Sequence, residues 1–563
     1  MKKSSIYILF LSLFFLFLVP FVILFSIDNK QNKLTAEVNA NFIDQHIEKS
    51  YQFDEGDAAA VTRDQDGYDH LYMWGDNSHY QLGLNYQTAY FPDSSDLNLT
   101  AKNYYYYPQE VAITKDNKGM IDDLKSTKFN TIVSFIDQDG NYHLYIYGSN
   151  VNGLLTKDQL YLNSSDPIII DIPTNLKIED LALTDDNVYL LLKEKSGKKQ
   201  YLYSWGLNIN GQLGLGFNDN FIHKTPNVSK YINGLSTDDY EIEQIYAQND
   251  ALYLVTKNKN EDDDFETIYT LGSNHDEQLA ITGLDYDDNI LIPTEIPYFE
   301  EIKANNIYLD GNNHYGIYAQ YQLLNQTYLV SWGNNRNNQL VNINQNIINQ
   351  PTGVFADQIG DSGEPIYDPQ EKDLLFSNYG YEQSFLIYQY QDQYQLYGWG
   401  LNNHYSLGIS DNQIHNTEPI AIKSINNQNY QVKGLSTGSH SSSLIIEDQD
   451  NNQSLYTWGY NQTGQLGNGE EASFTAEQNT TFYLSLQTYI VKESSNNYYK
   501  LPLAIFIVIV ILLLLVLITL YISVKRYKVL EAKKKQTGQQ QNEVLNQELT
   551  AELTTQNLDL NVD

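Results

Sequence analysis

Short acidic turns are the residues of this sequence that most resemble a metal site. Asp64-Gln-Asp-Gly67 and Asp137-Gln-Asp-Gly140 share one pattern, Asp448-Gln-Asp450 repeats its first part, and Glu261-Asp-Asp-Asp264 is an acidic run. Closely spaced carboxylates suit Ca²⁺, but these turns lack the remaining spacing of an EF-hand loop. Asp also hydrogen-bonds to the backbone of a turn. Because the Asp-x-Asp turns recur at one hairpin position, turn formation is the favoured interpretation, and we predict no metal site.

Candidate catalytic residues are not grouped in the sequence either. The 10 histidines are scattered, and His314 and His440 begin strand-like segments, where a packing or hydrogen-bonding role is favoured. The absence of Cys excludes a thiol nucleophile, thiolate metal sites and disulfides. Glycoside hydrolysis needs one specific pair of carboxylates, and no pair stands out. We therefore predict no catalytic residue and no cofactor, with an extracellular hydrolase as the least favoured alternative.

The charge is concentrated in the middle of the chain. Of the 34 basic and 70 acidic side chains, residues 27–500 hold 26 and 64, so this region carries a net charge of −38. Such a surface repels a phosphate backbone. Nucleic acid is thus excluded as a partner.

A repeat organises the same region. Seven copies of an apolar–Tyr–x–Trp–Gly segment occur, with successive glycines 58 to 73 residues apart, and all 5 tryptophans occupy the one slot before the glycine. Asn stands two residues after each glycine and Leu seven residues after it. The repeated residues are Trp74, Gly75, Asn77 and Leu82; Gly148, Asn150 and Leu155; Trp205, Gly206, Asn208 and Leu213; Gly272, Asn274 and Leu279; Trp332, Gly333, Asn335 and Leu340; Trp399, Gly400, Asn402 and Leu407; and Trp458, Gly459, Asn461 and Leu466.

Each copy must be positioned by at least one β-hairpin. A short run rich in aromatic and branched residues, such as Val188–Leu192, precedes a polar turn and then the strand that ends at Trp-Gly. The glycine permits a bend or a positive φ, Asn can bond its own backbone, and Leu and Trp can fill the space between sheets. A single sheet cannot bury both faces, whereas a ring of seven can. The predicted fold class is all-β, a seven-bladed β-propeller flanked by two transmembrane helices.

The copies resemble the repeat of the regulator of chromosome condensation family. Trp205–Gly214 and Trp458–Gly467 match its pattern Trp-Gly-x-Asn-x-x-Gly-Gln-Leu-Gly throughout, while Glu277, Ala280, Asn338 and Val341 depart from it. The resemblance covers roughly residues 50–490 and implies a seven-bladed propeller. It also implies closure by strands from both ends, with 482–491 pairing with 41–53. The family's nucleotide-exchange activity is not carried over, because these motifs do not identify the loops it needs.

Two apolar segments flank the propeller. Ser4–Ile27 and Leu501–Val524 are each long enough to cross a bilayer at 1.5 Å per residue. A cleaved signal peptide is the alternative for the first. Lys2 and Lys3 precede the first segment and six basic residues follow the second within 525–535, which predicts cytoplasmic termini and an extracellular propeller.

The predicted organisation follows from these segments. It comprises a cytoplasmic N-terminus (1–3), a transmembrane helix (4–27), a linker (28–49), the propeller (50–490), a second linker (491–500), a second transmembrane helix (501–524) and a polar cytoplasmic tail (525–563). The tail is expected to be disordered because it is rich in Gln and Asn. A short amphipathic helix around Leu545, Leu549 and Leu553 is the alternative.

A tyrosine cluster is the candidate partner-binding loop. Tyr104, Tyr105, Tyr106 and Tyr107 end a long insertion between Leu84 and Pro108. Clustered tyrosines on a loop offer contact area at low entropy cost, and simple packing in a Tyr-rich protein is the equal alternative. We expect a membrane-anchored bacterial surface module that binds a protein or glycan, or alternatively a sensor that signals through its tail.

Overall fold

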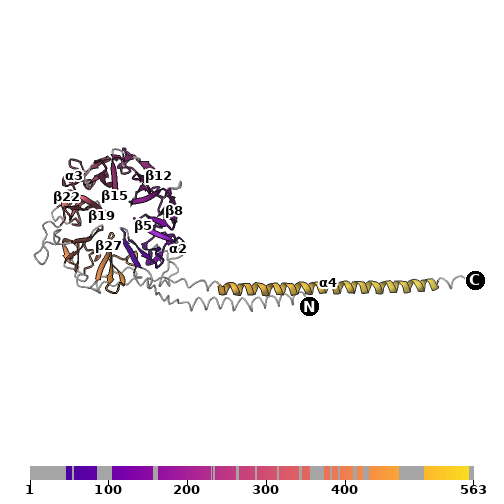
Figure 1. Cartoon of the computed structure of the whole chain (residues 1–563). Coiled ribbons are helices and arrows are strands. Elements are labelled where there is room, and N and C mark those ends of the chain that lie inside the picture. Colours follow the sequence, from indigo (N-terminus) through magenta and orange to yellow (C-terminus); the bar gives the residue numbers. More distant parts are fainter. Residues whose placement is uncertain are drawn as a thin grey trace, which may run out of the picture. The chain divides into compact units, whose positions relative to one another are not determined.

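The computed structural model describes the propeller and one C-terminal helix as two separate compact units. The described residues are 46–467 and 500–556, except for gaps at 54–55, 85–103, 156–162, 230, 233–234, 237, 261–264, 286–287, 313–315, 341–344, 355–372, 381–382, 391–392, 410–414 and 422–429. Seven antiparallel sheets are arranged in a ring in the first unit (Figure 1). The prediction of an all-β seven-bladed propeller is therefore confirmed.

Each blade is a meander whose first strand lies nearest the centre of the ring. Blade 1 holds β1 (His46–Gln52), β2 (Asp57–Arg63), β3 (Asp69–Asp76) and β4 (Tyr104–Glu110); blade 2 holds β5 (Gly119–Ser126), β6 (Asn130–Asp137), β7 (Tyr142–Gly148) and β8 (Ser164–Asp171). Blade 3 holds β9 (Leu176–Leu183), β10 (Asn187–Glu194), β11 (Gln200–Leu207) and β12 (Ile222–Ser229); blade 4 holds β15 (Tyr240–Gln248), β16 (Ala251–Asn258), β17 (Glu266–Ser273) and β18 (Asn289–Glu295).

The remaining blades follow the same order. Blade 5 holds β19 (Asn305–Asn312), β20 (Gly316–Leu323), β21 (Gln326–Asn334) and β22 (Ile347–Gly353); blade 6 holds β23 (Asp373–Tyr379), β24 (Gln383–Tyr390), β25 (Gln393–Leu401) and β26 (His415–Ala421). Blade 7 holds β27 (Tyr430–Thr437), β28 (Ser441–Asp448) and β29 (Gln453–Gly459). Two short helices, α2 (Ala112–Asp116) and α3 (Pro297–Ile302), and a small hairpin, β13 (Tyr231–Ile232) with β14 (Leu235–Ser236), lie between strands.

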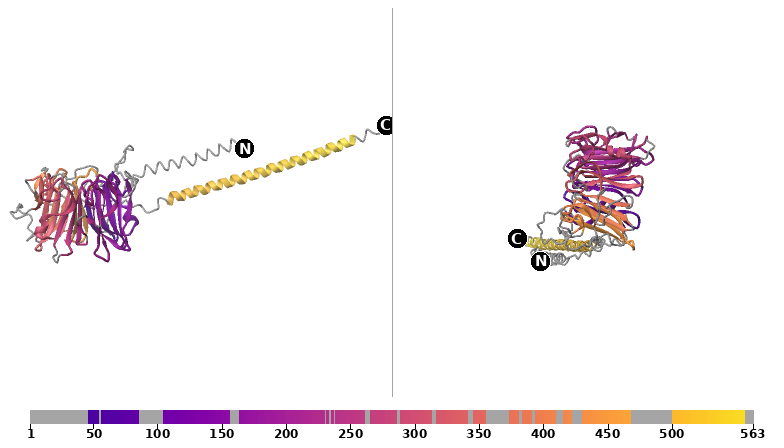
Figure 2. Two further views of the ribbon diagram at one scale, coloured as in Figure 1. Left: turned by 90° about the horizontal axis from the view of Figure 1, so that it is seen from above. Right: turned by 90° about the vertical axis from the view of Figure 1, so that its left-hand side faces the viewer.

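The burial pattern of the strands explains which of them can be recognised from the sequence. The second strand of a blade is covered on both faces by its neighbours, so β6 and β10 are buried over their first six residues. First strands instead alternate and carry a register shift against the second strand, such as the one between Ile121 and Asp123 of β5. Such a bulge bends the strand and increases its twist. Side views show strands running between the two faces of a short cylinder (Figure 2).

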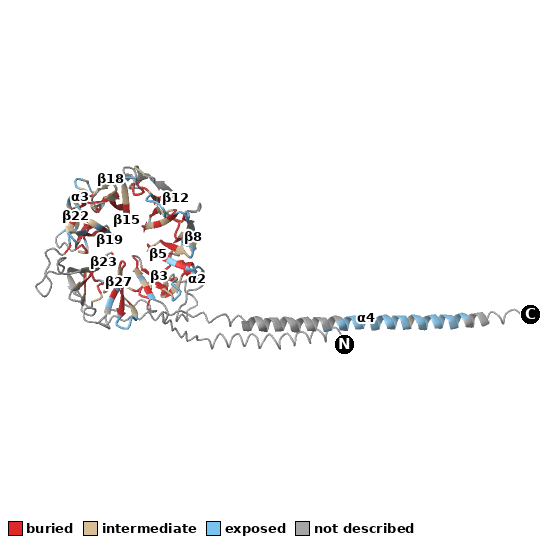
Figure 3. Cartoon of the chain, viewed as in Figure 1, coloured by how far each residue is buried: buried red, intermediate tan, exposed pale blue. Residues whose placement is uncertain are grey.

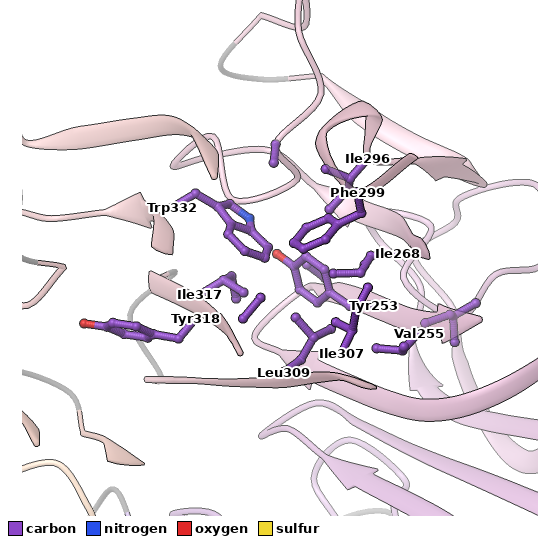
Figure 4. Close-up of a cluster of buried hydrophobic side chains, with 14 of the residues drawn as sticks. Tyr253, Val255, Ile268, Ile296, Phe299, Ile307, Leu309, Ile317, Tyr318 and Trp332 are labelled. Atoms are coloured by element: carbon purple, nitrogen blue, oxygen red, sulfur yellow. The ribbon is translucent and has the colours of Figure 1, made fainter. Parts of the chain in front are cut away.

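The core lies between blades. Buried residues line the inner parts of neighbouring sheets around the ring (Figure 3). Between blades 4 and 5, Phe299 of α3 packs on Trp332, with ring centroids 6.0 Å apart, and both face Tyr253 (Figure 4). Each interface between blades is thus a small aromatic and aliphatic core.

The ring closes between blades 1 and 7. Ser50 of β1 lies 3.0 Å from Ser443 of β28 through their Oγ atoms, and the Gln52 N–H donates to Ser436 Oγ at 2.9 Å. Residues 46–52, part of the predicted linker and of the predicted closing strand, pair with β2 as the innermost strand of blade 1. Their predicted partner, 482–491, lies outside the described residues.

The second unit is helix α4 (Lys500–Gln556). Where the sequence predicted a disordered tail after residue 524, the structure has a helix to Gln556. The physical reason is composition, since this stretch is rich in Ala, Leu, Lys, Glu and Gln, which all favour helix. Within the part of the chain that the structure describes, no helix combines the length and apolar character needed to cross a membrane. Residues 4–27 and the side chains of 501–518, where the predicted spans fall, lie outside the described residues.

Candidate functional site

The repeated Asn closes the turn after the third strand of every blade. In all seven copies its Oδ1 accepts a hydrogen bond from the backbone N–H of the repeated Leu, at 2.8 to 3.3 Å. In four copies its Nδ2 also donates to a carbonyl further along the loop, as Asn208 does to Phe217 at 2.9 Å. The Asn is buried in each copy. Its polar groups therefore serve the turn.

The repeated Gly is required by backbone geometry. All seven glycines have a positive φ, between 96° and 119°. In Gly206 a Cβ atom would lie 2.0 Å from the carbonyl oxygen of Asp186, and Gly75, Gly148, Gly272 and Gly459 face the equivalent carbonyl at 2.0 to 2.3 Å. Only a residue without a side chain fits this approach. The contact joins the turn between the first two strands to the turn after the third, so both lie on one side of the ring, here called the motif face.

The repeated Trp joins five of the blades to the blade before each of them. All five indole Nε1–H groups donate to a backbone carbonyl of the preceding motif turn: Trp74 to Gln465, Trp205 to Leu154, Trp332 to Gln278, Trp399 to Gln339 and Trp458 to Ser406, at 2.6 to 2.9 Å. The first of these bonds spans the ring closure. The repeated leucines are buried as well. The predicted motif residues thus form one structural ring.

The tyrosine cluster lies in a strand. Tyr104–Tyr107 begin β4, the outer strand of blade 1, and Tyr105 and Tyr106 are buried. Tyr105 belongs to the core between blades 1 and 2. The segment is thus a strand and not a loop, and the alternative of simple packing describes Tyr105 and Tyr106, while a partner-binding role for the cluster stays a prediction. Tyr104 and Tyr107 are half-buried.

The acidic turns use their carboxylates on their own backbone. Asp137 Oδ1 accepts from the N–H groups of Asp139 and Asn141 at 2.9 and 2.8 Å, and Asp448 Oδ1 accepts from Asp450 and Asn452 in the same way. A hydrogen bond from His143 holds the pKa of Asp137 down to about 2. No group of three or more metal-ligating side chains occurs among the described residues. Residues 261–264 and His314 lie outside them.

One groove opens beside the Asp137 turn of blade 2. It has a volume of about 510 Å³ and is lined by Phe135, Tyr145 and Ile169 together with Asp116, Asp139 and Asp171. His440, the other histidine singled out in the sequence, packs instead against His404 and Tyr460, with centroids 5.4 and 6.1 Å away. These contacts fit the packing role predicted for His440.

Carboxylates on the first strands of two blades link these blades to their neighbours. Asp180 Oδ2 accepts from the N–H of Ile245 in the next blade at 2.7 Å, and burial raises the pKa of Asp180 to about 6. Asp310 Oδ2 accepts from Asn378 of the next blade at 3.4 Å, and burial raises its pKa to about 7. Desolvation disfavours the charged form of both carboxyls. These groups are thus structural links as well.

An exposed apolar patch lies on the motif face of blades 2 and 3, and the sequence did not indicate it as a site. It consists of Val151, Ile209, Phe217 and Phe221, which are 48%, 46%, 48% and 73% exposed. Val151 and Ile209 occupy the position directly after the repeated Asn. The other five copies have Ser78, His275, Arg336, Asn403 and Gln462 there. A comparison of the seven copies at this position is the signal that could have found the patch.

Contacts between the two turns hold the patch together. Asn152 of the blade 2 turn donates to the Asp186 carboxylate of blade 3, and Gly153 lies against Ile222, next to Phe221. Within blade 3, Asn218 Nδ2 donates to the Ile209 carbonyl at 3.1 Å. The four apolar side chains therefore stand on loops that are bonded to one another.

Acidic side chains surround this patch. Asp185 is exposed, and Asp186, Asp219 and Asp250 are half-buried. Burial, together with the neighbouring Asp250 and Asp185, raises the pKa of Asp186 to about 6. Lys224 is half-buried on β12 beside Gly153, and Nε2 of His223, on the same strand, lies 3.1 Å from Asp219 Oδ1. The arrangement can bind an apolar surface that carries positive charge.

Comparison with known proteins supports the repeat. The model of the regulator of chromosome condensation (RCC1) repeat matches residues 452–480. Rho GTPase-activating protein gacGG of Dictyostelium discoideum is 34% identical over 118 residues, which are 20% of this chain and 9% of that protein. The chain thus spans a small part of that relative.

At least one solved structure shares the fold. Human WBSCR16 superposes with a TM-score of 0.53 at 17% identity, covering 72% of this chain and 93% of that one. The propeller domain of the Trilobed protease of Pyrococcus furiosus has a TM-score of 0.37 at 8% identity, covering 77% and 99%. At 17% identity the likeness to human WBSCR16 concerns the fold alone.

Proposed function

We propose that this seven-bladed propeller, whose last copy matches the RCC1 repeat, is a protein-binding module anchored at the outer face of a plasma membrane. One observation carries the binding role. The repeated Asn, Gly and Trp use their hydrogen bonds and close contacts inside the ring, so specificity is left to positions that differ between copies. A rigid ring that presents variable loops is a common arrangement for recognition.

The membrane anchor rests on the sequence. Ser4–Ile27 and Leu501–Val524 have the length and apolar character of spans, and the basic residues at 525–535 favour a cytoplasmic C-terminus. The net charge of −38 over residues 27–500 suits an exposed surface that does not bind nucleic acid.

A crosslinking capture from intact cells tests the binding role. A fragment of residues 41–490, which contains the closed ring, is the bait. We expect one specific protein to be recovered, whereas capture of a glycan alone would replace the protein partner in this proposal. Turnover of a glycoside or peptide substrate that disappears on replacing one carboxylate would refute the non-enzymatic role.

Protease treatment of intact cells tests the topology. The propeller should be cleaved or released, while an epitope tag at residue 563 should survive. A propeller that survives while the tag is lost would overturn the orientation.

A sensor is the second candidate function. Its support is α4, which is one continuous helix from Lys500 to Gln556 and so joins the second apolar segment to the tail without a break. Deletion of residues 536–563 should leave partner capture unchanged under the binding proposal. A cellular response that requires the tail would favour the sensor.

A further inference from the structure

We propose that the apolar patch on blades 2 and 3 docks a basic amphipathic segment of a partner protein, a step that rests on the proposed binding function. The patch is a departure from the repeat at the same place in two adjacent blades. Val151 and Ile209 stand where the other five turns have polar residues, and each leaves nearly half of its surface exposed. The turn itself does not need an apolar residue there, because the hydrogen bond from the backbone N–H of the repeated Leu to the Asn Oδ1 forms in all seven copies.

Two aromatic side chains enlarge the patch. Phe217 and Phe221 leave the same loop on either side of Asp219, whose backbone N–H donates to the Asn208 carbonyl at 3.0 Å and whose Oδ1 accepts from the Phe221 N–H at 3.3 Å. These bonds fix the loop while both rings stay exposed. Exposed aromatic residues grouped on one face are typical of interaction sites.

The negative charge around the patch indicates which kind of partner segment can bind there. Four carboxylates lie on or against these loops: Asn152 donates to Asp186 and to the carbonyl of Asp185, Asn210 donates to Asp250, and Asp219 pairs with His223. Because these carboxylates outnumber His223 and Lys224, a partner that offers apolar side chains flanked by Lys or Arg fits the patch. A second copy of this chain is a poor occupant, because each copy carries a net charge of −36 and would bring further carboxylates to this border. A helix with one apolar face and basic edges satisfies both requirements.

Binding of two designed peptides to the full chain tests this assignment. The probes are an 18-residue amphipathic helix of Leu and Lys and the same peptide with Glu for Lys, each followed by fluorescence anisotropy. The Lys peptide should bind at least 10-fold more tightly than the Glu peptide. The variant Val151→Ser/Ile209→Asn takes residues that other copies carry at this position, so it should fold and bind the Lys peptide about 10-fold more weakly.

Matched control variants distinguish binding of the peptide at the patch from its general attraction to a negatively charged protein. Ile292→Ser and Leu324→Ser replace exposed apolar residues of blades 4 and 5 and should leave the affinity unchanged. Equal binding by the patch variant and the parent chain would overturn the assignment, as would a change in oligomeric state caused by the patch variant. If the patch variant still captures the cellular partner, this inference fails while the proposed function stands. If the parent chain captures no partner, the proposed function fails whatever the peptides do.

Discussion

Replacing single tryptophans by Phe measures what the bonds between blades contribute. Trp74→Phe removes the indole N–H that donates to the Gln465 carbonyl across the ring closure. Trp399→Phe removes the equivalent donor to Gln339, but Tyr318 and Ser384 also donate to that carbonyl through their hydroxyl groups. Both tryptophans are fully buried, so the two substitutions remove the same atoms from similar surroundings.

The expected difference follows from the acceptors. Each substitution removes about three buried ring atoms, which costs about 2 kcal/mol at about 0.8 kcal/mol per CH₂-sized group. Trp74→Phe also leaves a buried carbonyl without its described donor, which costs about 1 to 3 kcal/mol more. Trp399→Phe avoids most of this second cost, because Tyr318 and Ser384 still donate to the Gln339 carbonyl. Trp74→Phe should therefore lower the free energy of unfolding by about 1 to 2 kcal/mol more than Trp399→Phe.

Urea unfolding followed by far-UV circular dichroism provides the measurement, since it does not depend on Trp fluorescence. Trp205→Phe is the third variant, because Trp205 bonds the Leu154 carbonyl inside the ring rather than across its closure. We expect it to behave like Trp74→Phe. Equal losses for Trp74→Phe and Trp399→Phe would refute the argument from the acceptor. A large loss for Trp74→Phe alone would assign the effect to ring closure instead.

Three further predictions concern the glycines, the repeated Asn and pH. Gly206→Ala should destabilise the propeller by about 3 kcal/mol or more in thermal unfolding, because Gly206 has a positive φ and the new Cβ would lie 2.0 Å from a carbonyl oxygen. Gly140→Ala, at φ +76° with no atom within 4 Å of the new Cβ, should cost only about 1 kcal/mol in the same measurement. Asn461→Ala leaves the buried Leu466 N–H without its acceptor and should cost about 1 to 3 kcal/mol in urea, while Asn461→Asp, which keeps an acceptor oxygen, should cost less. The hydrogen bond from His70 to Glu110 raises the pKa of His70. The stabilisation by His70 should therefore be fully present below about pH 6.5 and lost as pH rises through the folded-state pKa of His70. A stability difference between the parent chain and His70→Gln that is independent of pH would contradict this.

The repeat was predictable because its residues have distinct structural roles, Gly and Asn in all seven copies and Trp in five. Gly at positive φ, Asn on the turn and Trp between blades each tolerate few substitutes, so their spacing survives in the sequence. First strands were harder to foresee, because one of their edges faces the centre of the ring and their bulge breaks the alternation. The segment Gly119–Ser126, for example, mixes Met, Asp and Lys with few apolar residues.

The patch and the tyrosine strand were missed for opposite reasons. For Tyr105 and Tyr106 a binding loop and simple packing stayed equal alternatives, because burial depends on the neighbouring sheet, which local composition does not describe. Val151 and Ile209 were passed over because apolar residues are ordinary in a propeller. Their exposure becomes informative only when the turn geometry shows that this position points outward.

Internal repetition separates the residues that build the ring from those that could give it specificity. Positions that are alike in seven copies are explained by bonds within the ring, which every blade must make. A position that is polar in five copies and apolar in two adjacent ones has no such explanation, since the turn closes with Val151 as it does with Arg336. Exposing those side chains costs solubility, and an acidic border limits nonspecific association. The departure from the repeat, rather than the repeat, is therefore where a partner is best sought.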